Sequence, residues 1–243
     1  MGTAMARKSG LERPLANARD LTIAAAFALF ALLLFLWRIT DPGKLDFDET
    51  HYVPSARLLI DFASLPNPEH PPLGKWLIGI GMLMFDDTPL GWRIMSAVFG
   101  AILVFAGVMA ARWLFLSRAA AVMTGALLLF SQTLFIQSRI GMLDIFMASF
   151  LMLAFWMLTA AIRKNLQPRW QIALTGLFLG LAVACKWTAI PLVATAIIAF
   201  FLTWRRVTPE KKPISLIEGL LWLGPFAVLI YLLTFTPLMF LRN

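Results

Sequence analysis

The 243-residue sequence has few of the residues that soluble proteins use for charge, metal binding and cross-linking. It contains one cysteine, Cys185, so an internal disulfide is excluded. Only 14% of its residues are charged, whereas a soluble domain has about 25%. The sequence also has no internal repeat, low-complexity tract or evident soluble domain. This composition excludes a disulfide-stabilised scaffold, a coiled coil and a disordered chain.

Apolar residues are abundant instead, at 60% of the total. A bilayer core needs about 20 apolar residues of helix, so long charge-free runs predict membrane spans. Seven runs qualify: residues 21–37, 94–111, 119–138, 145–162, 170–185, 187–204 and 219–241. The run at 76–85 is too short to cross and predicts an interfacial helix. We therefore expect an all-α, polytopic membrane protein with about seven transmembrane helices.

The net charge of +8, from 21 basic and 13 acidic residues, predicts membrane orientation better than nucleic-acid binding. Basic residues concentrate in cytoplasmic segments. If residues 1–20 are cytoplasmic, the basic segments 7–19, 112–118, 163–169 and 205–212 all fall on the inner side. The first run is expected to be an uncleaved anchor, because no small-residue cleavage site follows it. Residues 21–243 then form one transmembrane module, with 40–92 as a long extracytoplasmic loop.

The loop at 40–92 contains a predicted amphipathic helix. Apolar side chains recur with helical spacing at Tyr52, Ala56, Leu59, Ile60 and Ala63. Pro54 fits only in the first turn of such a helix, so Asp48 and Glu49 are expected at its N-terminus, where carboxylates are favoured. We expect this helix to lie flat on the membrane surface.

Two other roles remain open for the acidic residues of this loop. Asp48 and Glu49 could simply cap the predicted helix. Both histidines of the chain, His51 and His70, also lie in the loop, which raises the question of a divalent metal. Their spacing matches no strong ligand pattern, so a metal site is not favoured.

Charged residues also lie at the outer ends of the predicted spans: Arg93, Arg139, Asp144 and Lys186. A charge costs about 2.5–3.5 kcal/mol at the bilayer centre and less near the interface. Snorkelling, or an Arg139–Asp144 pair across a turn, accounts for these residues singly. Together the three cations favour a binding site for an anion such as a phosphate head group, above apolar helix faces that accept a lipid tail.

Five motifs follow one another along the chain: 47–52 (FDETHY), 70–75 (HPPLGK), Arg93 with 96–100 (SAVFG), 138–144 (SRIGMLD) and 176–187, which ends in Lys-Trp. Their order and spacing resemble the protein O-mannosyltransferase family, a branch of the GT-C membrane glycosyltransferases. The aminoarabinose transferases of lipid A share the Asp-Glu loop and the arginine. They typically read Lys-Pro-Pro-Leu in the second motif, so they are the alternative.

The resemblance implies transfer of a sugar, expected to be mannose, from a polyprenyl or dolichyl phosphate to an acceptor hydroxyl with inversion. The acceptor would be a protein serine or threonine. By position in the motifs, Asp48 is the expected general base, and Glu49 would orient the loop or the acceptor. A positioned base of this kind contributes roughly 10²–10⁴-fold to the rate.

The remaining motif residues are expected to bind or position the substrates. Arg93 would bind the donor phosphate, assisted by Arg139 or Lys186, because fixed cations stabilise a leaving group that gains negative charge. Residues expected to position the loop or the substrate are His51, His70, Lys75 and Asp144.

The resemblance also implies what the chain binds. The lipid-linked sugar is a co-substrate, and no cofactor or metal is required. Expected partners are the lipid donor, an acceptor protein or glycolipid, and membrane lipid, but not nucleic acid. Family members are longer, so the need for a partner subunit or a further C-terminal half stays open. A transporter, which often shows repeats and broken helices, and a non-catalytic membrane subunit are the other open interpretations.

Overall fold

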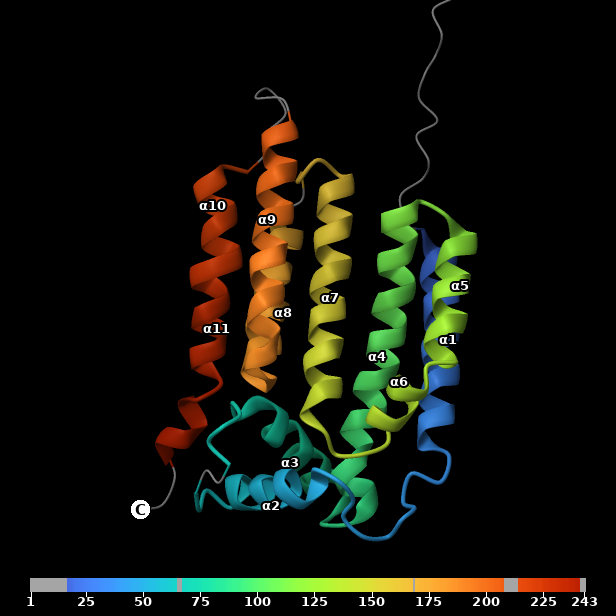
Figure 1. Cartoon of the computed structure of the whole chain (residues 1–243), viewed down its shortest axis with the longest axis vertical. Helices are drawn as coiled ribbons and strands as arrows, with labels where there is room; N and C mark the ends of the chain where they lie inside the picture. The colour runs from blue at the N-terminus through green and yellow to red at the C-terminus, as the bar shows by residue number, and fades with distance from the viewer. Residues whose placement is uncertain (1–16, 65–66, 168, 208–213, 241–243) are drawn as a thin grey trace, which may run out of the picture.

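The computed structural model of the protein describes residues 17–64, 67–167, 169–207 and 214–240. Within these ranges the chain is helical and has no strand, so the predicted all-α fold is confirmed. Long helices run alongside one another, and α2 (Glu49–Ile60) and α3 (Leu73–Phe85) lie together at one end, named here the loop end (Figure 1). The predicted orientation also depended on basic residues within 1–16 and on Lys211 and Lys212, which lie outside the described residues.

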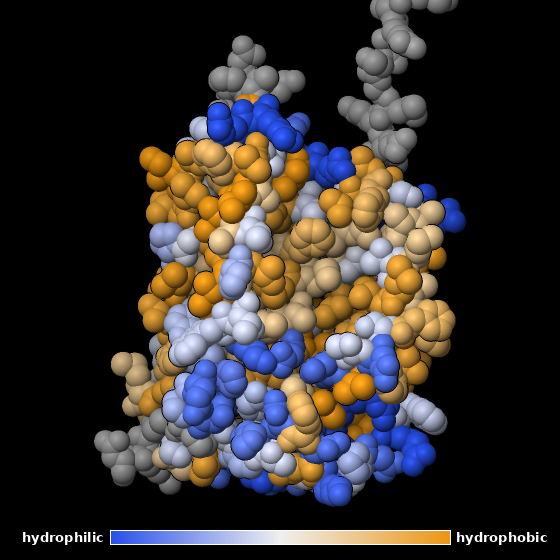
Figure 2. Space-filling view, viewed as in Figure 1, coloured by the Kyte–Doolittle hydropathy of each residue, from blue (hydrophilic) through white to orange (hydrophobic). Residues whose placement is uncertain are grey.

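The other elements follow in chain order. They are α1 (Ala18–Leu36), α4 (Pro89–Phe115), α5 (Arg118–Leu129), α6 (Gln132–Gln137), α7 (Leu143–Arg163), α8 (Arg169–Cys185), η1 (Trp187–Ala189), α9 (Ile190–Arg206), α10 (Leu216–Leu221), η3 (Trp222–Phe226), α11 (Ala227–Leu233) and η4 (Thr236–Phe240). Figure 2 shows hydrophobic residues over the sides of this bundle and hydrophilic residues gathered at its two ends. This distribution fits a protein that spans a membrane.

Five stretches of the described chain are long and apolar enough to cross a bilayer: Ala18–Leu36, Pro89–Phe115, Leu143–Arg163, Trp187–Arg206 and Leu216–Phe240. The predicted number of seven spans is therefore not confirmed. The run predicted at 170–185 is α8, whose 17 residues make it a shorter apolar helix.

The prediction of one continuous span at 119–138 is wrong. Helix α5 ends at Leu129 and α6 begins at Gln132. Ser131 leaves the helix between them, and its hydroxyl accepts a hydrogen bond from the Leu134 N–H at 3.3 Å. A serine in this position satisfies a free N–H of the next helix and so starts a new helix.

Helix α2 begins at Glu49, as predicted from the acidic pair. Its buried face includes Tyr52, Ala56 and Leu59, as the spacing predicted, although Ala63 lies beyond its end. The prediction for Pro54 is wrong, because this proline lies inside α2 rather than in its first turn. A proline has no N–H to donate one turn back, so the Thr50 carbonyl lacks that helical partner, and Thr50 is exposed.

Helix α4 is the central element, and it packs against α1, α3, α5 and α7. Thr88 caps its N-terminus by accepting a hydrogen bond from Gly91, and Pro89 occupies the first helical position, where its missing N–H costs nothing. At the end opposite the loop end, Asp20 of α1 pairs with Arg112 at 3.2 Å and with Arg118 at 2.7 Å. These contacts fix α1, α4 and α5 relative to one another and so set the frame for the loop end.

Candidate functional site

A buried ion pair joins α2 to α4 at the loop end. The Arg93 Nε and Nη2 atoms donate to the Glu49 carboxylate at 2.7 and 2.8 Å, and both side chains are 0% exposed. The remaining guanidinium donors go to the carbonyls of Ile39 (3.0 Å), Pro42 (2.9 Å) and Lys44 (3.0 Å). A guanidinium has five N–H donors, so all of them are used within the chain. Arg93 therefore holds the segment between α1 and α2 over the site.

Glu49 is as fully engaged as its partner. Its Oε1 atom accepts the Gly141 N–H at 2.8 Å, and its Oε2 atom accepts the Asp46 N–H at 3.0 Å. A side chain at position 141 would come within 3.2 Å of the Trp92 carbonyl and 3.5 Å of Glu49 Oε1, so glycine allows this close approach. Glu49 thus fastens the loop before α7 to α2.

Asp48 is half-buried beside this pair and has a different environment. Although it is the residue before α2, its side chain makes no capping hydrogen bond, so the helix-capping alternative is not realised for Asp48. Tyr52 follows one helical turn later and is buried. Burial, followed by the negative charges of Asp48 and Asp144, raises the pKa of Tyr52 to about 12. Both carboxylates therefore lie near the same phenol.

A second ion pair lies across the site from α2. The Lys186 ammonium, which follows α8, donates to both carboxylate oxygens of Asp144, on the first turn of α7, at 2.8 and 2.9 Å. The two side chains are 20% and 31% exposed. This pair is therefore accessible, whereas the Glu49–Arg93 pair is sealed.

Arg139 lies at the end of α1, so the suggested Arg139–Asp144 pair is wrong. Its guanidinium donates to carbonyls in the last turn of α1 and just beyond, including Phe35 at 3.3 Å and Arg38 at 3.0 Å. It also lies 4.9 Å over the Phe135 ring. Free carbonyls at a helix C-terminus attract cations, which explains this placement.

Lys75 and His70 organise the approach to α3. The Lys75 side chain is fully buried, and its ammonium donates to the carbonyls of Asn67 and, at 3.0 Å, His70. Burial lowers the pKa of Lys75 to about 8. The His70 ring meets Tyr52 edge-on, with 5.8 Å between ring centroids. Burial and then the positive charge of Lys186 lower the pKa of His70, so this imidazole faces the site.

Of the predicted site residues, Asp144 and Lys186 form an ion pair, and Asp48 and His70 both lie near Tyr52. Glu49, Arg93 and Lys75 are buried behind them, Arg139 lies apart at the end of α1, and His51 is exposed on α2. The sequence had assigned Tyr52 only to an apolar face, and the structure adds its edge-on contact with His70.

The described residues contain no group of three or more histidine, cysteine, aspartate or glutamate side chains placed to hold a metal ion. At the loop end, the Asp144 carboxylate is paired with the Lys186 ammonium.

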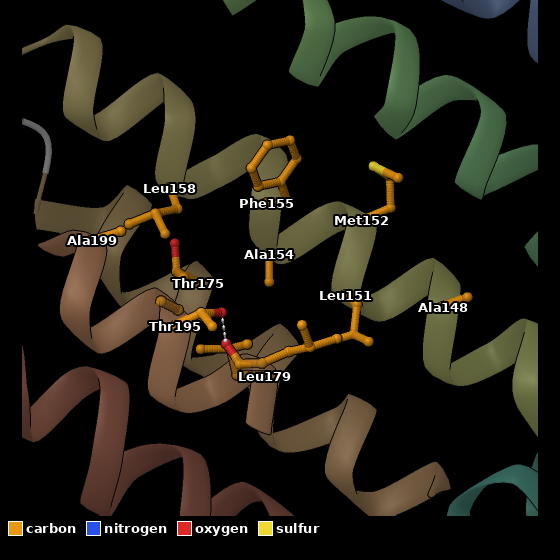
Figure 3. A pocket seen from close by; sticks show the side chains of 12 residues that line it. Ala148, Leu151, Met152, Ala154, Phe155, Leu158, Thr175, Leu179, Thr195 and Ala199 are labelled. Carbon is orange, nitrogen blue, oxygen red and sulfur yellow. Dashed lines mark hydrogen bonds between the residues drawn. The ribbon is translucent and has the colours of Figure 1, made fainter. Parts of the chain in front are cut away.

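An apolar groove begins one helical turn from Asp144. It has a cavity volume of about 500 Å³ and lies between α7, α8 and α9. Figure 3 shows side chains of α7, from Ala148 to Leu158, along one wall. The hydroxyls of Thr175 and Thr195 donate to carbonyls of their own helices at 2.7 Å, so the groove offers an apolar surface. Such a groove suits a hydrocarbon chain rather than a polar ligand.

Comparison with known sequences identifies relatives. Residues 69–234 match the model of the dolichyl-phosphate-mannose-protein mannosyltransferase family. Two similar proteins are polyprenol-phosphate-mannose–protein mannosyltransferases. That of Corynebacterium glutamicum is 37% identical over 71% of this chain and 39% of its own length. That of Mycobacterium tuberculosis is 30% identical over 92% of this chain and 50% of its own length. The chain thus spans half or less of these relatives' length.

Solved structures give the same fold. The S. cerevisiae protein O-mannosyltransferase Pmt1-Pmt2 complex bound to the sugar donor matches with a TM-score of 0.80 at 20% identity, over 93% of this chain and 35% of that chain. ArnT from Cupriavidus metallidurans bound to undecaprenyl phosphate matches with a TM-score of 0.62 at 21% identity, over 90% of this chain and 42% of that chain. The family match and the sequence relatives favour the first predicted family over the aminoarabinose alternative. The chain belongs to the dolichyl-phosphate-mannose-protein mannosyltransferase family.

Proposed function

We propose that this chain transfers mannose from a polyprenyl phosphate to a serine or threonine hydroxyl of a protein, at the loop end of the bundle. The observation that carries the proposal is the accessible Asp144–Lys186 pair at the start of the apolar groove, with the half-buried Asp48 near the phenol that Asp144 also approaches. The activities for which the relatives are named supply the donor and the acceptor class. We further propose that the loop end faces the extracytoplasmic side, as the basic segments predicted.

The reaction needs a base and a cation on opposite sides of the sugar. Asp48 takes the proton from the acceptor hydroxyl, whose oxygen then forms a bond to the anomeric carbon of the sugar. The bond between that carbon and the phosphate oxygen breaks, and the configuration inverts. The departing phosphate gains negative charge, which the Lys186 ammonium stabilises, with His70 beside it.

The carrier lipid is assigned to the apolar groove along α7. Asp144, Ala148, Leu151 and Met152 recur with helical spacing, so a phosphate at Lys186 lies over the start of the groove. An isoprenoid chain would bury apolar surface there, and each buried CH₂ contributes about 0.8 kcal/mol. The head group of one lipid would thus contact the Asp144–Lys186 pair while its tail lies in the adjacent apolar groove.

Glu49 and Arg93 are assigned a supporting part in this proposal. Because every N–H of Arg93 is used within the chain, its role is to hold Glu49 and the segment before α2. Glu49 in turn holds Gly141 and hence the start of α7. This network fixes the position of Asp48, just before α2, relative to the pair formed by Asp144 on α7 and Lys186 after α8.

A transfer assay with purified chain, polyprenyl-phosphate-mannose and a Ser/Thr peptide tests the proposal, with and without EDTA. The wild-type chain is expected to mannosylate the peptide in both conditions. Asp48→Asn is expected to lose roughly 10²–10⁴-fold in kcat while still binding donor. Asp61→Asn is the matched control, since Asp61 is exposed at the other end of α2.

Three outcomes would count against parts of the proposal. An inactive wild-type chain would overturn the enzymatic assignment in favour of a non-catalytic subunit. Full activity in Asp48→Asn would remove the assignment of the base. Loss of wild-type activity in EDTA would contradict a metal-free mechanism.

A further inference from the structure

We propose that Trp187 is a positioning residue for Lys186, because its indole ties the turn that carries the Lys186 ammonium to α11. The inference rests on the proposed function, in which Lys186 binds the donor phosphate. The fifth motif ends in a Lys-Trp pair, and the proposed function gives a task only to the lysine. The tryptophan contacts a different helix from the one that its neighbour contacts.

Lys186 lies in a break between two helical segments. Its backbone is extended (φ −158°, ψ 131°) between the end of α8 and the start of η1. Its N–H donates to the Ala182 carbonyl, and its own carbonyl accepts from the Ala189 N–H, both at 3.1 Å. The ammonium reaches Asp144 at 2.8 and 2.9 Å. Because the chain changes direction here, the position of the ammonium depends on how this turn is held by its neighbours.

The two residues after Lys186 anchor the turn to two different helices. The Trp187 Nε1–H donates to the Tyr231 hydroxyl of α11 at 3.2 Å. The Thr188 hydroxyl donates to the Met147 sulfur of α7 at 3.2 Å. Three consecutive side chains of the turn therefore bond in order to α7, α11 and α7. The bond from Trp187 is the one that holds the turn from the side away from α7.

The Tyr231 hydroxyl is a well-fixed acceptor for this bond. Gly180 of α8 packs so closely on α11 that a side chain there would come within 2.4 Å of the Ala227 carbonyl. Ala227 lies one helical turn before Tyr231, so this contact holds the part of α11 that carries the tyrosine. The Tyr231 ring also meets Phe235 edge-on, with 5.0 Å between ring centroids. Trp187 thus connects the turn to a helix that is itself held against α8.

The indole borders an open apolar groove, so packing alone does not fix its orientation. A second cavity of about 600 Å³ lies between α8, α9 and α11, and both Trp187 and Tyr231 line it. Space is therefore left beside the indole, and the hydrogen bond selects one orientation among those that the space allows. Loss of this bond should let the turn, and the Lys186 ammonium with it, adopt other positions.

A binding cycle between Tyr231→Phe and Lys186→Met tests the inference without catalysis. Tyr231→Phe removes the acceptor hydroxyl and keeps the ring. Its affinity for a short-chain polyprenyl phosphate should be roughly 3–5-fold weaker than that of wild type, because one neutral hydrogen bond biases a turn by about this factor. In the Lys186→Met background the same change should leave affinity unaltered, because no ammonium remains to be positioned.

Matched variants exclude a general effect of aromatic substitution. Trp187→Phe removes the donor of the same bond, so combining it with Tyr231→Phe should weaken binding no further than Trp187→Phe does alone. Trp170→Phe is the control, since Trp170 is exposed at the opposite end of α8, and this variant should bind as wild type does. The midpoint of thermal unfolding should stay close to wild type in Tyr231→Phe and in Trp170→Phe.

The outcomes separate this inference from the function on which it rests. Unchanged affinity in Tyr231→Phe would overturn the positioning role. An equal loss of affinity from Tyr231→Phe in the wild-type and Lys186→Met backgrounds would also overturn it, because the effect would not act through the lysine. In both cases, weaker binding by Lys186→Met alone would leave the proposed function standing. If Lys186→Met binds the phosphate as tightly as wild type, the proposed function loses its donor contact and the inference is overturned with it.

Discussion

Two carboxylate–cation pairs at the loop end, Glu49–Arg93 and Asp144–Lys186, resemble each other in chemistry and differ in accessibility. Glu49 and Arg93 are 0% exposed, and both are saturated by contacts within the chain. Asp144 and Lys186 are 31% and 20% exposed, and they bond to each other through a single ammonium. The first pair holds α2 and α4 together. We propose that the second can exchange one partner for a substrate.

The difference explains how one end of a membrane bundle can be both rigid and reactive. A buried pair is costly to break because the remaining charge is left without a partner in a poorly polarisable environment. A partly exposed pair can be solvated while it rearranges, so opening it costs less. We therefore expect loss of fold from changes to the sealed pair and loss of chemistry from changes to the accessible pair.

The largest effect is expected from Arg93→Met. Removing one partner of a buried pair costs about 3–5 kcal/mol, because Glu49 then stays buried and charged. The variant should unfold at a much lower temperature in detergent and lose transfer activity. The double variant Glu49→Met/Arg93→Met should unfold at a higher temperature than the single variant. A single variant as stable as wild type would contradict the structural role.

The next effect is expected from Lys186→Met. Removing a donor that faces a developing negative charge lowers kcat by roughly 10²–10³-fold. The midpoint of thermal unfolding should change much less than in Arg93→Met, because this pair is partly exposed. Lys186→Arg, which keeps the charge, should recover part of the activity. Equal activity in the methionine and arginine variants would show that charge is not the relevant property.

A smaller effect, dependent on pH, is expected from Asp87→Asn. Hydrogen bonds from Arg57 (2.6 Å) and Trp92 (2.6 Å) hold the pKa of Asp87 below its usual range. A lowered pKa stabilises the fold above the unfolded-state pKa, and this stability is lost as pH falls through the folded-state pKa. The midpoint of thermal unfolding of the variant should therefore lie slightly below that of wild type at pH 7 and should equal it at strongly acidic pH. A difference in unfolding midpoint that grows as the pH is lowered would contradict this prediction.

The smallest effect is expected from Arg38→Gln. Arg38 and Asp41 form an ion pair at 2.8 Å, but their side chains are 67% and 56% exposed. Exposed pairs of this kind contribute little, since water screens the charges. Thermal unfolding and transfer should both match wild type within error. A measurable loss of stability would mean that side-chain exposure does not predict how much the Glu49–Arg93 and Asp144–Lys186 pairs contribute to stability.

Composition and periodicity predicted the class of fold well. The apolar runs indicated helices, and the spacing at Tyr52, Ala56 and Leu59 indicated the buried face of α2. Where a single residue decided the outcome, the prediction was less accurate. Ser131 divides a run that looked continuous, and Pro54 lies inside α2 rather than in its first turn. The pattern of apolar residues does not show where local hydrogen bonds start a new helix or where a helix contains a proline.

The motifs named residues that lie at the loop end, but they did not give the pairings between them. Asp144 and Lys186 form an ion pair, and Asp48 lies near Tyr52, as Asp144 does. The sequence could not reveal that the N–H groups of Arg93 all donate hydrogen bonds to Glu49 and to backbone carbonyls. Pairing depends on which helices are neighbours in space, and residue spacing along one chain does not determine that.

The central claim is that Lys186 faces the donor phosphate while Asp48 faces the acceptor. Equilibrium binding of a short-chain polyprenyl phosphate to wild type, Asp48→Asn and Lys186→Met tests it most directly, without catalysis. The account predicts unchanged affinity in Asp48→Asn and affinity at least about 10-fold weaker in Lys186→Met, as expected for loss of a charge-assisted contact. Equal affinity for wild type and Lys186→Met would contradict it.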